Sequence, residues 1–257
     1  QGVAKAGQGT AIHAIGDRAV RTALDAAQAL RQAGDSKTRL IITHAQLVDP
    51  ADARRFAANN VIVQTTGVWM NVQPSLISFL GQKRNDTLQF PLRSLVDSGA
   101  VVALGADWPA TLGGFEHGVN PFNNIYTAMH RKPPQHLVAE FVSVDKTLPP
   151  KREVLTLAEA IQAYTLNGAR QMGKEKEFGS IEVGKKADLI LLSQNLFKVE
   201  PDALPATKVL ATMAGGRLVH DVAYGIGDAD LTKLDELDQG AVGLCPHDGE
   251  HSPGHNH

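Results

Sequence analysis

Four apolar runs, each followed by a helical pattern, constrain the fold of this chain more than any other feature. We expect strands at residues 10–14, 39–44, 61–66 and 101–104. The last of these runs has no alternating polar residues, so both of its faces should be buried, as in a parallel strand. Helical patterns follow the runs, with apolar residues at a spacing of three to four. An alternation of strands and helices predicts an α/β fold with a parallel sheet.

The number of these strand-helix units limits the architecture. The four units occupy roughly half of the 257 residues, whereas a complete (β/α)₈ barrel takes roughly 250 residues, so a full barrel does not fit. A small open doubly wound sheet is an alternative, and it also binds ligands beyond the carboxyl ends of its strands. No G-x-G-x-x-G motif follows the first run, so we do not expect a dinucleotide site.

The sequence changes in character after residue 176. A strong strand pattern covers residues 187–192, and residues 208–213 and 217–220 read as the two strands of a β-hairpin around a glycine pair. We therefore divide the chain into an α/β unit at residues 1–176, a small β unit at 177–222 and a polar tail at 223–257. The tail is rich in polar and acidic residues, so we expect it to be disordered.

Three polar side chains stand where predicted strands end. His13, His44 and Asp107 each lie at the carboxyl end of a different strand. The carboxyl ends of parallel strands meet at one edge of a sheet, and two imidazoles with one carboxylate are a normal ligand set for Zn²⁺. Taken one at a time, each His is also consistent with a core or loop histidine, and Asp107 with a cap of the turn before Pro109.

Five short motifs resemble, in the expected order, those of the amidohydrolase superfamily. They lie at residues 13–17, 43–46, 105–109, 178–189 and 212–219, and the resemblance covers about residues 8–221. Within the superfamily, the chain is similar to the N-substituted formamide deformylase-like branch of metal-dependent hydrolases. The fourth motif resembles the segment in which family members leave the barrel and join a β-sandwich.

The resemblance implies a fold, a cofactor and residue roles. It implies half of a (β/α)₈ TIM-type barrel, units five to eight, plus a small C-terminal β-sandwich segment. It implies one or two divalent ions, usually zinc, with His13, His44 and Asp107 as metal ligands. Asp107 is the implied catalytic residue, because the family's last-strand Asp takes a proton from water and passes it to the leaving amine. A carboxylate that touches both metal and water suits such a transfer.

Several departures from the family pattern limit what is implied. Relatives carry a His-x-His pair on the first barrel strand and a further ligand on the fourth, and nothing before His13 matches either. His255 and His257 have the spacing of that pair but lie in the polar tail. Ala106 stands where relatives often have Ser or Thr. Three residues are candidates for the substrate pocket: Asp17, Trp108 and Arg131. Their alternative roles are a helix cap, a core residue and an exposed charge, respectively, so the substrate-binding residues stay unknown.

These observations predict a function in one of two classes. The first is a metal-dependent hydrolase of carbon–nitrogen bonds other than peptide bonds, in an amide, formamide or cyclic amide. As a C-terminal fragment it should be poorly active alone, because three ligands without the His-x-His pair hold a metal weakly. The alternative is a non-catalytic binding or regulatory protein on an amidohydrolase scaffold. A third reading, an open α/β protein without metal, requires that the three side chains do not converge.

Composition argues against nucleic-acid and membrane partners, and the family resemblance implies a small-molecule substrate. A net charge of −2 gives no basic surface for nucleic acid, and no apolar run reaches the roughly 18 residues of a membrane span.

The single cysteine, Cys245, favours the cytoplasm. The first residue is Gln, so we expect a processed product or part of a longer parent chain, whose export stays open. The outer strands of a half-barrel expose their edges, so we expect a homo-oligomer or pairing with the missing N-terminal half.

Overall fold

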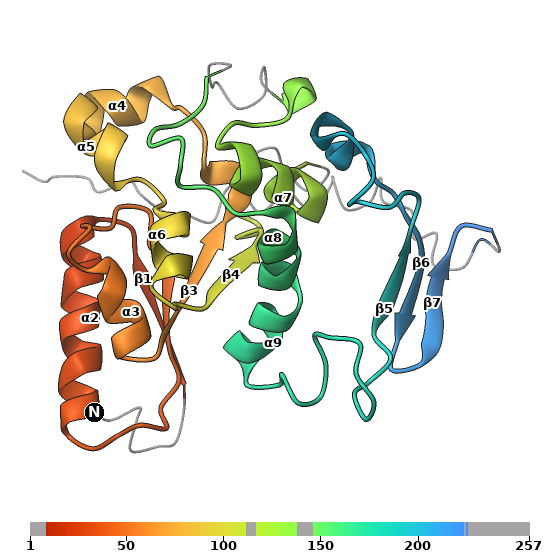
Figure 1. Ribbon diagram of the computed structural model, residues 1–257, viewed down its shortest axis with the longest axis horizontal. Helices are drawn as coiled ribbons and strands as arrows, with labels where there is room; N and C mark the ends of the chain where they lie inside the picture. Colours follow the sequence, from red (N-terminus) through yellow and green to blue (C-terminus); the bar gives the residue numbers. More distant parts are fainter. Residues whose placement is uncertain (1–8, 112–116, 138–145, 224, 226–257) are drawn as a thin grey trace, which may run out of the picture.

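The computed structural model describes residues 9–111, 117–137, 146–223 and 225, which form two separate sheets (Figure 1). The first sheet is parallel and the second is antiparallel. The prediction of an α/β fold with a parallel sheet is therefore confirmed. The parallel sheet contains β1 (Thr10–Ala14), β2 (Leu40–His44), β3 (Val61–Thr66) and β4 (Val102–Gly105), and the antiparallel sheet contains β5 (Leu189–Leu192), β6 (Val209–Ala214) and β7 (Arg217–Asp221).

The parallel strands follow one another in space as they do in sequence. Their order is β1-β2-β3-β4, without the reversal that a doubly wound sheet places at its switch point. This order contradicts the doubly wound alternative for the described strands. The helices that connect or flank them are α2 (Asp17–Gln32), α3 (Ala53–Ala58), α6 (Leu92–Asp97), α7 (Pro121–His130), α8 (Leu157–Tyr164) and α9 (Leu166–Met172).

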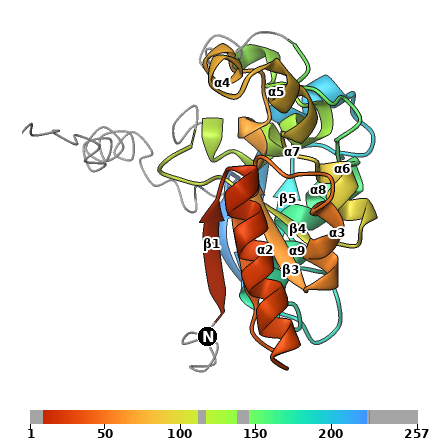
Figure 2. The same cartoon turned by 90° about the vertical axis from the view of Figure 1, so that its left-hand side faces the viewer.

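The main core lies between the parallel sheet and these helices. Leu24 of α2 and Phe56 of α3 are fully buried, and they belong to one apolar cluster with Ile42, Val63 and Val102 of the strands. Helix α2 runs along β1, and α8 and α9 pack beside β4 (Figure 2). Residues of α6, α7 and α8 join the same cluster, so these helices share one core with α2, α3 and the sheet.

The segment between β3 and β4 differs most from the sequence prediction. It contains α4 (Pro74–Leu80) and α5 (Gln82–Leu88), which the pattern did not separate from loop, and a short 3₁₀ turn, η1 (Gly67–Trp69). A capping box of Thr156 and Glu159 begins α8, and Thr165, whose backbone leaves the helical region, separates α8 from α9. Two further 3₁₀ turns are η3 (Gln135–Leu137) and η4 (Pro201–Ala206).

The tail predicted at residues 223–257 lies almost wholly outside the described residues, so the expected disorder and the His255–His257 pair are not tested. Over the part of the chain that the structure describes, none of the helices has the length and apolar character to cross a membrane.

Candidate active site

Two histidines from neighbouring parallel strands meet at the carboxyl edge of the sheet. His13 is in β1 and His44 is the last residue of β2. The distance between Nδ1 of His13 and Nε2 of His44 is 2.9 Å, and the ring centroids lie 4.4 Å apart in an edge-to-face arrangement. His44 is 5% exposed, whereas His13 is open to solvent. The predicted convergence of these two side chains is therefore seen in the structure.

The backbone of His44 makes this meeting possible. In the strand register His44 is paired with Ala14, and His13 is paired with Thr43. Paired residues of parallel strands point to the same face, so regular pleating would turn His44 toward the helices, where Ala14 is buried. Instead His44 and Ala45 have φ angles of 73° and 43°. This left-handed backbone, which is uncommon outside glycine, brings the imidazole to His13, and such strain is concentrated at functional sites.

The face of the sheet that carries His13 becomes more polar toward its carboxyl edge. The register places His13, Thr43 and Gln64 in one row with Ala103, one step beyond the row that contains Ala11, Ile41 and Ile62. A side chain at Gly105 would come within 2.9 Å of Nε2 of Gln64. Glycine at this position therefore leaves room for a polar side chain beside the strand end that leads to Asp107.

Asp107 lies near the histidine pair without joining it. It follows β4, is partly exposed and also has a left-handed backbone, with a φ of 56°. Burial lowers the pKa of His44 below its ordinary 6.5, His13 adds to this effect, and the negative charge of Asp107 opposes it. Among the described residues, no three His, Cys, Asp or Glu side chains lie close enough together to hold one metal ion. The structure thus brings His13 and His44 together but not Asp107.

The donor chemistry of the histidine pair fits a divalent cation. Two ligands of a tetrahedral zinc ion, each about 2.0–2.1 Å from the metal, lie about 3.3 Å apart. The two ring nitrogens, at 2.9 Å, need to separate only slightly to reach that spacing. A lowered pKa also keeps His44 neutral near pH 7, which is the form that binds metals.

The three remaining pocket candidates have different surroundings. Asp17 begins α2 and forms an ion pair with Arg84 of α5 at 2.5 Å. Trp108 follows Asp107 and is 49% exposed. Arg131 is fully buried, so it is neither an exposed charge nor a residue of an open pocket. Its guanidinium donates hydrogen bonds to the backbone carbonyl oxygens of Gln89, Phe90, Leu148, Pro149 and Glu153.

Trp69 is the neighbour of the histidine pair that sequence reasoning did not identify. Its ring stacks on His44, with centroids 5.4 Å apart and planes 10° from parallel. The only signal in the sequence was an aromatic residue shortly after the end of β3. Thr65 and Thr66, at the same strand end, carry buried hydroxyl groups without a hydrogen-bond partner among the described residues.

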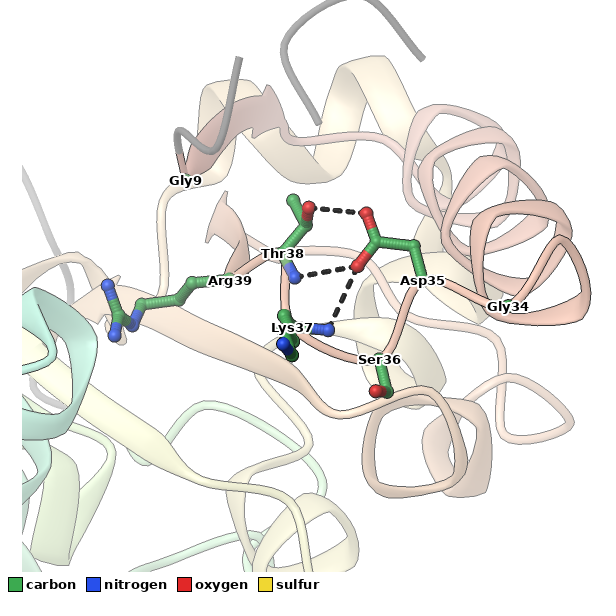
Figure 3. A pocket seen from close by; sticks show the side chains of 7 residues that line it. All are labelled: Gly9, Gly34, Asp35, Ser36, Lys37, Thr38 and Arg39. Atoms are coloured by element: carbon green, nitrogen blue, oxygen red, sulfur yellow. Dashed lines mark hydrogen bonds between the residues drawn. The ribbon is translucent and has the colours of Figure 1, made fainter. Parts of the chain in front are cut away.

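A pocket of about 490 Å³ lies at the opposite edge of the sheet (Figure 3). Its lining includes Gly9 and Arg39, which precede β1 and β2, so it is at the amino ends of the strands. Asp35 organises its loop by accepting hydrogen bonds from the backbone N–H groups of Lys37 and Thr38 and from the Thr38 hydroxyl. The carboxylate is occupied by its own loop, and the pocket is not part of the candidate site.

Comparison with known proteins identifies the family of this chain. The model of the Amidohydrolase family matches residues 2–220. The Arabidopsis thaliana "Protein LONG AFTER FAR-RED 3" is 32% identical over 225 residues, which cover 84% of this chain and 35% of that protein. The Arthrobacter pascens "N-substituted formamide deformylase" is 29% identical over 218 residues, covering 84% and 37%.

A solved structure supports the fold. The structure of an adenosine deaminase from Xanthomonas campestris with bound zinc superposes with a TM-score of 0.55 at 19% identity, covering 90% of this chain and 56% of that one. The chain spans little more than a third of the length of the two curated relatives. Because the family model matches most of its residues, the chain belongs to the amidohydrolase family.

Proposed function

We propose that this chain is the C-terminal part of a metal-dependent hydrolase that acts on carbon–nitrogen bonds other than peptide bonds. The observation that carries the proposal is the contact between His13 and His44 at the carboxyl edge of the parallel sheet. Active sites of barrel enzymes lie at this edge. The class of bond is supported by the names of two similar proteins, a formamide deformylase and an adenosine deaminase.

We propose further that residues 1–176 are units five to eight of a barrel and residues 177–222 part of a β-sandwich. The sequential strand order and the core that the helices share with the sheet support the first assignment. The antiparallel sheet of β5, β6 and β7 supports the second. Since β1 and β4 are the outer strands of the parallel sheet, we expect the other barrel strands, or a second copy of the chain, to pair with them.

In this proposal His13 and His44 hold a divalent ion, zinc, together with Asp107. The ion, when bound, supplies a Lewis acid that polarises the carbonyl of the substrate and activates water. Asp107 accepts the proton of the attacking water and returns it to the leaving amine, because a carboxylate beside the reacting atoms can do both. His44 stays neutral in its buried position and so offers a lone pair.

A non-catalytic binding role on the same scaffold is the second candidate. It is favoured by one observation, the lack of a third metal-binding side chain beside His13 and His44 within the described residues. Under this alternative Asp107 is a loop residue, and its substitution leaves ligand affinity unchanged.

Zinc titration of the purified chain tests the proposal. We expect one zinc ion per chain at saturation, with at least a tenfold loss of affinity in His13→Ala and His44→Ala and a smaller loss in Asp107→Asn. His220→Ala, in β7, is the matched control and should bind like the wild type. Zinc binding that is equal in His44→Ala and the wild type would contradict the metal site. If the chain hydrolyses an N-substituted formamide and Asp107→Asn does so at the same rate, the catalytic role of Asp107 is contradicted.

A further inference from the structure

The imidazole of His44 is held by aromatic rings on two sides. The indole of Trp69 lies parallel to it at 5.4 Å, and the ring of His13 approaches it edge-on at 4.4 Å. The left-handed backbone of His44 removes its side chain from the regular pleat of β2. The strand itself therefore does not determine the direction of the ring, and its neighbours must do so.

The turn that carries Trp69 is attached firmly to helix α7. A side chain at Gly67 would clash with the carbonyl oxygen of Asn124, so the two backbones touch directly. The backbone N–H of Val68 donates to Oδ1 of Asn124 at 2.9 Å, and Nδ2 of Asn124 donates to the carbonyl of Gly118 at 2.8 Å. Val68 and Asn124 are both fully buried.

Packing, and not a hydrogen bond, sets the position of the indole. Trp69 packs against the buried side chains of Val68 and Leu137. Its Nε1–H is buried and has no acceptor among the described residues. A buried donor without a partner is unfavourable, so the ring stays there because its apolar contacts and the stack on His44 outweigh that cost.

We propose that Trp69 is a positioning residue: it keeps the imidazole of His44 turned toward His13, and Asn124 of α7 anchors the turn that holds it. This inference rests on the proposed function for its catalytic meaning, since the two imidazoles are the proposed metal ligands. Groups that orient a metal ligand are worth about 10–100-fold in metal affinity. Helix α7 thereby acts on the site although none of its described side chains belongs to the histidine pair.

Nuclear magnetic resonance on the metal-free chain with labelled histidine tests the contact itself. In the wild type, the indole ring current should move the His44 ring protons upfield, and a nuclear Overhauser effect should link the rings of His13 and His44. In Trp69→Ala the upfield shift and the inter-ring effect should be lost, whereas Trp69→Phe, which can still stack, should retain both. Phe79→Ala, a change at an aromatic residue that is 85% exposed, is the control and should leave them unchanged. Unchanged His44 signals in Trp69→Ala would overturn the inference.

Zinc titration of the same variants tests the consequence. We expect Trp69→Ala to weaken zinc binding about tenfold or more, with Trp69→Phe within about threefold of the wild type. Circular dichroism and thermal midpoints identify variants that fail to fold. Equal zinc affinities in Trp69→Ala and the wild type would overturn the positioning role. A wild-type chain that binds no zinc would overturn the proposed function instead, and the magnetic resonance result would still decide the role of Trp69.

Discussion

The parallel and antiparallel sheets of this chain bury their apolar residues to very different degrees. Ile42 and Val63, in the middle of the parallel sheet, are each 1% exposed, whereas Ile190 and Leu191 of β5 are 55% and 61% exposed. Successive residues of a strand point to opposite faces, so β5 exposes apolar side chains on both faces of its sheet. The parallel sheet is covered by its own helices, but the antiparallel sheet needs a covering that the described residues do not supply.

Truncation of one apolar side chain in each region measures this contrast directly. Phe56→Ala removes a fully buried ring from the main core and should destabilise the chain by about 3–5 kcal/mol. Ile190→Ala removes a half-exposed side chain and should change the free energy of unfolding by about 0.5 kcal/mol or less. Urea denaturation measures both. A large effect of Ile190→Ala would show that β5 is covered in solution and would remove the contrast.

Arg131 joins distant loops of the parallel region, and nothing comparable supports β5 among the described residues. Burial lowers the pKa of Arg131 to about 10 and the charge of Glu153 opposes this effect, so the guanidinium is protonated at pH 7 and donates to five carbonyl oxygens. Arg131→Met removes all five hydrogen bonds, and of the five oxygens the Phe90 carbonyl still accepts from the Leu92 N–H, so we expect a loss of about 3–5 kcal/mol. Arg54→Met, at an exposed position of α3, is the control. Thermal midpoints that are equal for the two variants would contradict this role.

A smaller effect is expected where the turn before Trp69 touches α7. Gly67→Ala forces the backbone of Asn124 to move and should cost about 1–3 kcal/mol. Gly168→Ala, in helix α9, has open space around the new methyl group and should stabilise the chain by about 0.5–1 kcal/mol. Calorimetry of the two variants measures both changes in the free energy of unfolding. Changes of equal sign would contradict tight packing between the turn and α7.

A further predicted effect is a dependence of stability on pH. Hydrogen bonds from Arg93 and the α8 N-terminus lower the pKa of Glu159 from its ordinary 4.5 to about 2. Because the pKa is lower in the folded state, this stabilisation is present above pH 4.5 and is lost as the pH falls toward 2. For this partly exposed group we expect about 1–2 kcal/mol. Denaturation midpoints of Glu159→Gln should converge with those of the wild type near pH 2, and a gap that persists there would contradict the prediction.

The sequence predicted most of the parallel sheet because its signals are local. The strands expected at residues 10–14 and 61–66 match β1 and β3, and the expected hairpin matches β6 and β7 within about one residue. The capping box of Thr156 and Glu159, which begins α8, is likewise a local feature of the sequence. Helices α4 and α5 were missed, because α4 has no buried residue and α5 buries only Asn85. Such helices lack the apolar periodicity from which the other helices were predicted.

The candidate site was only partly predictable. The predicted strand ends placed His13 and His44 at one edge of the sheet, and the structure shows their rings in contact there. Asp107 was expected to join them, but it reaches His44 only through its charge. The pattern also left open whether Arg131 lines a pocket or is an exposed charge, and its burial excludes both.

By itself, the amino-acid sequence determined the alternation of strands and helices, the family and the edge at which the polar residues gather, because each of these depends on residues close together in the chain. The tertiary structure alone decided the left-handed turn at His44, the stack of Trp69 on its ring and the burial of Arg131. The contacts behind these features join residues 17 or more positions apart, so they depend on how whole elements pack and leave no periodic signal in the sequence.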